Sequence, residues 1–405
     1  MASDGMTIRL HLRRMKVVRV VVDEIDELVI EVADTRSVVR CPACGYKTKK
    51  VHETRKVEVK DIPLGRPTTL VWLQRRFECP NCGERHTEDH PEIEGKTTRR
   101  LARQIVRDSK YLTIRELSRR HGLSWHLVMG MVRSWAERVV EHRRAQRCRV
   151  VMVDETSLRR RHRYVTVVLN GESGEVLGMV RHRDAKALTS FFAQQGHRWC
   201  RRVEVVVSDG SDSYRAAIHA HLGHATHVVD RFHVVRWFAA GLVEVRRRIQ
   251  RREPKGVKPA FEPSVFRSRF LALRRADRLE DAEQARLEAL FATHAELGRA
   301  WAMLQELHGL YLAEDEEGAM AALDRFDALY AEDPLPEFYK VVDTLLKWAP
   351  EIFAFHRTGR ITNGRLEGTN AKLGVLKRMA YGFVNASNFE ARGLLLCPPL
   401  PGLGP

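Results

Sequence analysis

The chain has 405 residues, 44% of them hydrophobic, which suits a globular protein with a sizeable core and two or more domains. It carries 69 Lys and Arg against 52 Asp and Glu, a net charge of +17, so we expect a polyanionic partner, with nucleic acid ahead of an anionic membrane surface. The sequence has no run of about 18 apolar residues and no apolar segment followed by a cleavage site, which argues against a membrane span and a secretory signal.

The cysteines point to a metal site rather than to disulfides. Seven cysteines form an odd count, and four of them lie in two close pairs, whereas Cys148, Cys200 and Cys397 lie alone. This pattern favours a reducing cytoplasm, where disulfide frameworks are rare.

Each close pair is a Cys-x-x-Cys knuckle followed by glycine, with ligands Cys41, Cys44, Cys79 and Cys82. The glycine lets backbone amides approach a thiolate. The stretch between the knuckles is β-rich, and residues 7–32 alternate apolar and charged side chains as a hairpin does. We therefore predict a zinc-ribbon-like module over residues 1–95, with one structural Zn²⁺ in a tetrahedral site of four thiolates.

Two alternatives use fewer of these cysteines. A redox pair would need only one knuckle. A second arrangement keeps Cys79 and Cys82 and adds His86 and His90, but the loop between Cys82 and His86 is too short for a finger helix. We expect His86 and His90 at the surface, where they could face nucleic acid.

Residues 96–149 predict a helix-turn-helix. A basic helix over 97–109 is followed by Thr113-Ile-Arg-Glu116, a capping box that opens a helix ending at His121-Gly122. Ser124 caps a further helix, and two short helices around a glycine turn are typical of this motif. An ordinary helical hairpin is the alternative. We expect the basic stretch from Glu137 to Arg149 to be a linker.

The positive charge around this motif favours DNA over an ordinary hairpin. The candidate DNA-binding residues are Arg99, Arg100, Arg103, His126 and Arg133.

From residue 150 the pattern is that of an α/β domain. We expect strands at 150–154, 164–169, 175–180, 203–208 and 226–229, and helices at 184–195, about 211–221 and from 231 onward. Three consecutive strands followed by alternating helices and strands is the order of a ribonuclease-H-like mixed sheet. In that order the first and fourth strands lie side by side.

Residues 251–360 lose the strand pattern and show helical periodicity, which predicts an all-helical insertion. The expected fold class is therefore multidomain. Its parts are a zinc module (1–95), a helix-turn-helix (96–149), a first part of the ribonuclease-H-like catalytic core (150–250), the insertion (251–360), the last part of the core (361–396) and a disordered tail (397–405).

Three carboxylates from distant segments suit divalent metal and phosphate. Asp154 and Asp209 each end an apolar, β-rich run, and Glu367 stands where a helix begins. Taken alone, each has an ordinary alternative: a turn or cap residue for either aspartate, and a surface ion pair for Glu367. Asp230 ends another apolar run and precedes His233, so its local pattern is as good as that of Asp209.

These residues together resemble the ISL3 family of bacterial insertion-sequence transposases, from about residue 15 to about residue 396. The resemblance rests on the paired knuckles, the helix-turn-helix and five motifs: Val-Asp-Glu-Thr at 153–156, Ser-Asp-Gly at 208–210, Val-Val-Asp-Arg-Phe-His-Val-Val at 228–235, Thr-Asn-Gly-Arg-Leu-Glu-Gly-Thr-Asn at 362–370 and Lys-Arg-Met-Ala-Tyr-Gly-Phe at 377–383. The Pro-rich end after Cys397 departs from the family pattern.

The resemblance implies an acidic triad on Asp154, Asp209 and Glu367, and a zinc module on the four knuckle cysteines. Asp230 and His233 then become candidates for contacting the metal ligands from behind or for positioning the substrate. The implied enzyme is a DDE transposase using two Mg²⁺ ions, with Mn²⁺ as a substitute, that cuts DNA at the element's terminal inverted repeats and joins the 3′-hydroxyl to target DNA.

The expected partners are double-stranded DNA, both element ends and target, and a second copy of the chain, because synapsis of two ends requires at least a dimer. The expected location is the bacterial cytoplasm, at the nucleoid. Two alternatives remain open: a non-catalytic zinc and helix-turn-helix DNA-binding regulator, and a ribonuclease-H-type nuclease without strand transfer.

Overall fold

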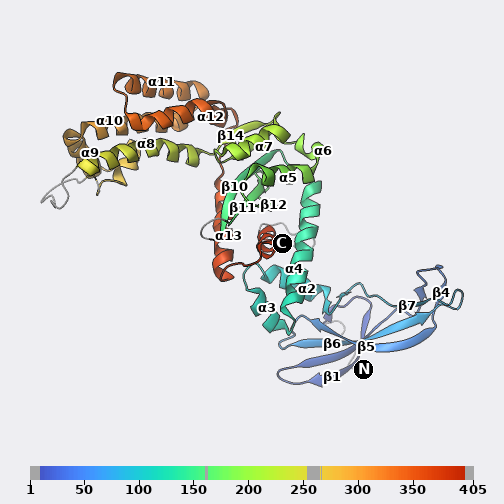
Figure 1. Ribbon diagram of the computed structural model, residues 1–405. Helices are drawn as coiled ribbons and strands as arrows, with labels where there is room; N and C mark the ends of the chain where they lie inside the picture. The colour runs from blue at the N-terminus through green and yellow to red at the C-terminus, as the bar shows by residue number, and fades with distance from the viewer. Residues whose placement is uncertain (1–9, 160–162, 253–264, 266, 397–405) are drawn as a thin grey trace. The chain divides into compact units, whose positions relative to one another are not determined.

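The computed structural model describes residues 10–159, 163–252, 265 and 267–396, which divide into two compact units (Figure 1). The first unit holds the described residues up to Val139 together with those from Leu376 onward, and the second holds Val140–Val375. Within the described ranges, no helix has both the length and the apolar character that a membrane crossing requires.

The first unit contains a seven-stranded sheet in the order β1-β2-β6-β5-β9-β8, with β7 paired to β6. The strands are β1 (Met15–Asp23), β2 (Leu28–Asp34), β5 (Val51–Asp61), β6 (Thr68–Glu78), β7 (Arg85–Thr87), β8 (Ile93–Glu94) and β9 (Thr97–Thr98), and a separate pair is formed by β3 (Val39–Arg40) and β4 (Lys47–Thr48). The hairpin predicted within residues 7–32 is confirmed as the antiparallel pair β1 and β2. Its inward residues pack with β6 around Ile30, Val32 and Trp72.

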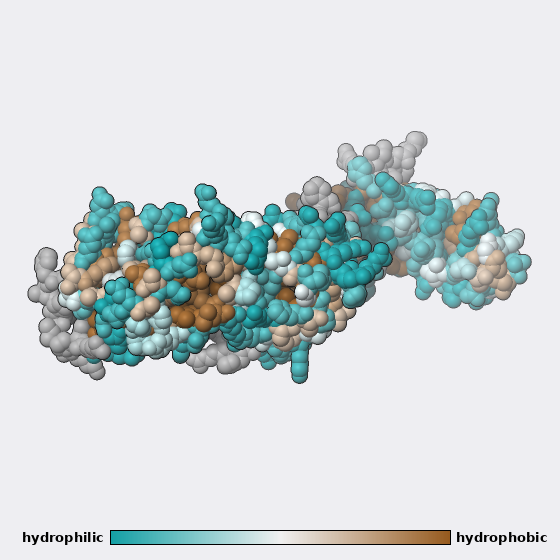
Figure 2. Space-filling view, turned by 90° about the horizontal axis from the view of Figure 1, so that it is seen from above, coloured by the Kyte–Doolittle hydropathy of each residue, from teal (hydrophilic) through white to brown (hydrophobic). Residues whose placement is uncertain are grey.

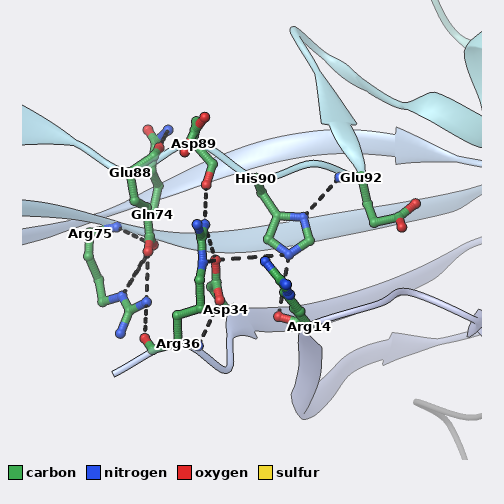
Figure 3. Close-up of polar contacts among 9 residues, drawn as sticks. All are labelled: Arg14, Asp34, Arg36, Gln74, Arg75, Glu88, Asp89, His90 and Glu92. Atoms are coloured by element: carbon green, nitrogen blue, oxygen red, sulfur yellow. Dashed lines mark hydrogen bonds and ion pairs between the residues drawn. The ribbon is translucent and has the colours of Figure 1, made fainter. Parts of the chain in front are cut away.

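A polar network joins the end of β2 to the segment that follows β7 (Figure 3). The buried carboxylate of Glu88 accepts from the Arg75 backbone N–H at 2.8 Å and from its guanidinium at 2.7 Å. Asp34, also buried, pairs with Arg36, and Arg75 donates to the Arg36 carbonyl at 2.8 Å. Two buried acids are thus neutralised by hydrogen-bonded arginines, as burial of charge requires.

His90 belongs to this network, so its expected surface position is wrong. The residue is 4% exposed, its Nδ1 accepts from the Glu92 N–H at 3.2 Å, and its Nε2 lies 3.3 Å from the Arg14 carbonyl (Figure 3). His86 is half-buried and stacks on Phe77 with 5.8 Å between ring centroids. Both rings pack locally in the β-rich region.

The described first unit also contains α2 (Arg99–Asp108), α3 (Ile114–His121), the N-terminal part of α4 (Trp125–Ala145), the end of α13 (Gly364–Met379) and α14 (Ala386–Leu394). Thr113 caps α3 by accepting from the Glu116 N–H at 3.0 Å, and Gly122 ends it in the left-handed region with φ 59°. The N-cap and glycine-turn predictions are confirmed, whereas the Glu116 carboxylate of the predicted capping box pairs with Arg119 and Arg120. Arg392 of α14, 2% exposed, donates to the carbonyls of Ser109 and Leu112, which ties α14 to the segment between α2 and α3.

The expected linker from Glu137 to Arg149 is wrong, because α4 continues as a helix to Ala145. Its charged face is not all solvated: Arg143 is 1% exposed and donates to the Val176 carbonyl at 2.6 Å. A charge run that suggests a solvated linker is therefore partly a packed helix face.

The second unit is built on a five-stranded sheet in the order β12-β11-β10-β13-β14 (Figure 1). Its strands are β10 (Val150–Arg159), β11 (Arg163–Asn170), β12 (Val176–Arg181), β13 (Val205–Ser208) and β14 (Thr226–Val229), and its helices include α5 (Ala185–Gln195), α6 (His197–Cys200), α7 (Asp212–Leu222) and α8 (Arg231–Arg252). β10 pairs antiparallel with β11 and parallel with β13, so the predicted adjacency of the first and fourth strands is confirmed.

β10 is longer than predicted, and Asp154 lies within it rather than at its end. The antiparallel pairing with β11 continues to Arg159, whereas the parallel pairing with β13 stops at Val153 and Ser208. Asp154 therefore comes directly after the last residue paired with β13.

After α8 the described chain contains only helices and connecting segments up to α13 (Gly364–Met379). They are η1 (Leu271–Leu273), η2 (Ala276–Arg278), α9 (Asp281–Thr293), α10 (Ala295–Leu312), α11 (Glu316–Glu332), η3 (Pro336–Phe338) and α12 (Tyr339–Arg357).

The face seen in Figure 2 is mostly hydrophilic with separate apolar patches. The predicted disordered tail from Cys397 lies outside the described residues.

Candidate active site and zinc-binding cluster

Cys41, Cys44, Cys79 and Cys82 come together with their ligand atoms within 4.8 Å of one another. The Sγ atoms of Cys41 and Cys82 are 3.7 Å apart, and those of Cys44 and Cys79 are 3.5 Å apart. Four sulfurs at zinc's usual bond length of about 2.3 Å would be separated by about 3.8 Å in a tetrahedron. The cluster therefore fits a structural zinc site.

The two knuckles have the same backbone geometry. In each, the glycine N–H donates to the carbonyl of the first cysteine at 2.9 Å, and the glycine has positive φ, 73° at Gly45 and 75° at Gly83. Only glycine adopts this region without strain. The backbone N–H of Tyr46 lowers the pKa of the Cys44 thiol, which favours the thiolate that binds zinc. The pKa of Cys82 is raised instead: the Glu84 N–H lowers it, but Cys44, Cys79 and Cys41 together raise it by more.

Cys44→Ser is expected to remove one zinc equivalent per chain and to unfold the knuckle region. A structural zinc site contributes roughly 10–16 kcal/mol of apparent binding free energy, far more than two small β-turns can replace. Metal content of the purified full chain measures the loss. Cys148→Ala, which changes a cysteine outside the cluster, should keep all the zinc. Unchanged zinc content in Cys44→Ser would overturn the four-thiolate assignment.

The acidic cluster forms where β13 ends beside β10. Asp154 follows the last β10 residue paired with β13, and Asp209 follows the last residue of β13. Asp154 Oδ1 accepts from the Glu155 N–H at 2.7 Å, and Asp209 Oδ1 from the Ser211 N–H at 3.3 Å. The parallel register of the two strands thus brings together two carboxylates that are distant in the sequence.

Burial and mutual repulsion penalise negative charge at both aspartates. Burial raises the pKa of Asp154, and the carboxylates of Glu155 and Asp230 add to the rise. Burial also raises the pKa of Asp209 to about 6, with further contributions from Asp154 and Glu155, while His233 opposes the shift. A divalent cation between the two carboxylates would relieve this penalty.

Helix α13 is held against the cluster by two asparagines, Asn363 and Asn370, which the sequence pattern does not single out. Asn363, 1% exposed, donates from its backbone N–H to Asp230 Oδ1 at 3.0 Å and from Nδ2 to the Val153 carbonyl at 3.4 Å. Asn370 Nδ2 donates to Asp154 Oδ2 at 2.8 Å. Both residues belong to the Thr-Asn-Gly-Arg-Leu-Glu-Gly-Thr-Asn motif. The motif identifies this segment but does not predict which residues its asparagines contact.

Glu367 lies on the same face of α13 as these asparagines, four residues after Asn363 and three before Asn370. Its backbone N–H donates to the Asn363 carbonyl at 2.9 Å, and its side chain is exposed. The structure therefore brings Asp154 and Asp209 together. Glu367 is on the neighbouring helix, and among the described residues the ligand atoms of these three acids do not all lie within 4.8 Å of one another.

Asp230 has a different environment. It is 2% exposed, and each of its oxygens accepts a backbone N–H: Oδ1 from Asn363 and Oδ2 from Phe232 at 3.2 Å. The same carboxylate forms an ion pair with His233 Nδ1 at 3.4 Å, which raises the pKa of His233. Asp230 thus caps the N-termini of both α8 and α13 by accepting a backbone N–H at each of its oxygens.

Gly210→Ala is expected to destabilise the protein by about 1–3 kcal/mol, the usual effect of overpacking. A Cβ at Gly210, directly after Asp209, would collide with the Trp237 ring, which packs on Trp348 with 6.1 Å between centroids. Denaturant unfolding measures the change. The matched control is Gly368→Ala in α13, where an added Cβ meets nothing within 4 Å. Equal stability of the two variants would show that a side chain at position 210 does not clash with Trp237.

The candidate DNA-binding residues differ in their environments. Arg100 donates from Nε to the buried carboxylate of Asp61 at 2.8 Å, and Arg133 donates to Asn388 Oδ1 at 2.6 Å. Arg99, Arg103, His126 and Arg133 are exposed, whereas Arg100 is half-buried. Arg100 thus contributes to the packing of α2 on β5.

Comparisons with known proteins match two parts of the chain to transposase families. A transposase family profile, that of the ISL3 transposases, matches residues 151–393, and a profile described as the zinc-finger of transposases IS204, IS1001, IS1096 and IS1165 matches residues 37–90. The first contains all three residues of the predicted triad, and the second contains all four knuckle cysteines.

Curated relatives cover nearly the whole chain. The transposase for insertion sequence element IS1001 of Bordetella parapertussis is 26% identical over 89% of this chain and 89% of its own length. The transposase for IS1557 of Mycobacterium tuberculosis is 28% identical over 90% of this chain and 87% of its own length. With the matched profile spanning more than half of the sequence, the chain belongs to the ISL3 family of insertion-sequence transposases, which are DNA-cleaving and strand-transferring enzymes.

Proposed function

We propose that this transposase cleaves DNA at the ends of its insertion sequence and joins the freed 3′-hydroxyl to target DNA at a site formed by Asp154, Asp209 and Glu367. The observation that carries the proposal is the meeting of Asp154 and Asp209 where β13 ends, with α13 tied to the same place through Asn370. The sheet order, three antiparallel strands followed by two parallel ones, supports a ribonuclease-H-like core.

The donor set fits Mg²⁺. Asp154, Asp209 and Glu367 offer carboxylate oxygens, and the buried Oδ1 of Asn370 has no hydrogen-bond partner beside Asp154. A hard cation prefers such oxygen ligands. When bound, two Mg²⁺ ions would activate the attacking water or 3′-hydroxyl and neutralise charge on the leaving oxygen.

The protein's own residues supply orientation. Asn363 and Asp230 fix the start of α13, and Asn370 fixes the Asp154 carboxylate, so the acids keep their relative positions as the phosphate approaches. The exposed Lys372 lies on the same helix, where it is available to a DNA phosphate. Rigid placement of this kind favours an in-line displacement.

Recognition of the element ends is assigned to the first unit. The zinc cluster and the helix-turn-helix of α3 and α4 would contact double-stranded DNA, with the exposed His126 and Arg133 on α4 as candidate base contacts. Lysines and arginines around them would contact phosphates. Synapsis of two ends calls for at least a dimer.

The deciding experiment is a strand-transfer assay with the full chain, Mg²⁺, an element-end duplex and a supercoiled target. Joined product is expected with the correct end and not with a scrambled one. Cleavage without joining would favour a ribonuclease-H-type nuclease, and end-specific binding without cleavage would favour a non-catalytic regulator.

A further inference from the structure

A second group of metal-ligating side chains lies on the other side of β13 from β10. His219 of α7, His227 of β14 and Glu351 of α12 offer ligand atoms within 4.8 Å of one another. His219 Nε2 is 3.8 Å and His227 Nδ1 is 3.9 Å from Glu351 Oε1. The proposed DNA chemistry uses none of the three.

The hydrogen bonds of His227 fix its tautomer. Ser208 Oγ lies 2.8 Å from the Asp209 carbonyl and 2.8 Å from His227 Nε2. A carbonyl can only accept, so the Ser208 hydroxyl donates to it and its oxygen accepts from the Nε2–H. The Nδ1 of His227 therefore carries a lone pair, and burial lowers the pKa of this imidazole to about 3, so it is neutral.

Glu351 presents a matching acceptor. The residue is 4% exposed; its Oε1 accepts from Arg215 Nε at 2.7 Å, and its Oε2 is buried without a partner. His227 Nδ1 is likewise buried without a partner. Leaving two buried acceptors unpaired is unfavourable, and a shared cation would remove this cost.

Arg215 orients the Glu351 carboxylate. Its guanidinium lies over the Trp348 ring at 4.6 Å and donates to the Lys347 carbonyl at 3.1 Å. It therefore holds Oε1 and leaves Oε2 available to a ligand. A hydrogen-bonded partner that orients a ligating group is a common feature of metal sites, as is the Ser208 contact to the far nitrogen of His227.

We propose that His219, His227 and Glu351 form a second metal site, which takes a divalent transition metal such as Zn²⁺ with a fourth position open to solvent. Two imidazoles and one carboxylate select zinc over Mg²⁺, which prefers oxygen ligands alone. His219 is exposed, so a metal ion can reach the site from solvent on its side. The metal would join α12 of the helical insertion to α7 and β14 of the sheet.

The test is the zinc content of the full chain after incubation with Zn²⁺ and removal of excess metal by gel filtration. Two zinc ions per chain are expected, falling to one in His219→Ala and in Glu351→Gln. His219 is exposed, so its truncation should not disturb folding. His221→Ala, on the same helix but outside the cluster, is the control and should keep two.

Cobalt distinguishes the two sites in the same chains. Co²⁺ in the cysteine cluster gives a thiolate-to-metal charge-transfer absorption, whereas Co²⁺ on two imidazoles and a carboxylate gives only weaker ligand-field bands. Cys44→Ser should lose the first signal and retain the second, and His219→Ala the reverse. A wild-type chain that holds one zinc, or a His219→Ala chain that holds two, would overturn the proposal whatever the chain does to DNA.

Discussion

Asp154→Asn is expected to abolish DNA cleavage while leaving the fold and DNA binding intact. An amide is a much weaker Mg²⁺ ligand than a carboxylate. Loss of a group that merely orients a metal ligand lowers activity roughly 10- to 100-fold, so loss of a ligand should lower it by more than about 100-fold. Cleavage of an end duplex at saturating DNA measures the effect, and gel-shift binding measures the DNA affinity.

The surroundings of Asp154 explain why the fold should survive. Its Oδ1 accepts from the Glu155 N–H and can remain an oxygen in the variant. Its Oδ2 faces Asn370 Nδ2, and the Oδ1 of Asn370 is unpaired, so rotation of the Asn370 amide would restore a bond to the new NH₂ group.

The control for this variant is Asp212→Asn, which changes an exposed acid three residues after Asp209 and should cut normally. An Asp154→Asn protein that cuts at the wild-type rate would contradict the metal-ligand role. One that neither binds DNA nor folds would show that the carboxylate is structural instead.

Much of the architecture follows from local patterns. The apolar runs at 150–153 and 203–208 predict strands, and their order predicts that they pair. The polar residues after Asp154 suggest the end of a strand, but the chain continues because β11 offers a partner up to Arg163. Strand length therefore depends on a neighbour that the local sequence does not reveal.

The site was predictable as a set of acids but not as a set of contacts. Asp209 and Asp230 each follow a short β-rich run, and local sequence does not separate a metal ligand from a helix cap. The structure gives the two aspartates different surroundings, because the N–H of Asn363, 133 positions away from Asp230, donates to Asp230 Oδ1. The Asn370 contact to Asp154 spans 216 positions. Such contacts join residues far apart in the sequence, which local periodicity cannot encode.

Glu367→Gln should lower cleavage by more than about 100-fold without changing stability, because Glu367 is exposed and its role is proposed to be metal binding. Asp230→Asn, in contrast, should lower stability and have a smaller effect on cleavage. An amide at position 230 can accept only through one oxygen, so it loses either the bond to Asn363 or the bonds at the start of α8. A buried donor left unsatisfied costs about 1–3 kcal/mol, so we expect lower stability and a cleavage loss within about 100-fold.

Denaturant unfolding and end cleavage, measured on both variants, separate the two roles. Glu317→Gln, which changes an exposed acid in the first turn of α11 as Glu367 is in α13, should match the wild type in both assays. If Glu367→Gln cuts normally while Asp230→Asn keeps its stability and does not cut, Asp230 is the third ligand and its bond to Asn363 must open when metal binds. If both variants cut normally, Asp154 and Asp209 act without a third carboxylate from either position, and the two-metal site proposed for this chain is wrong.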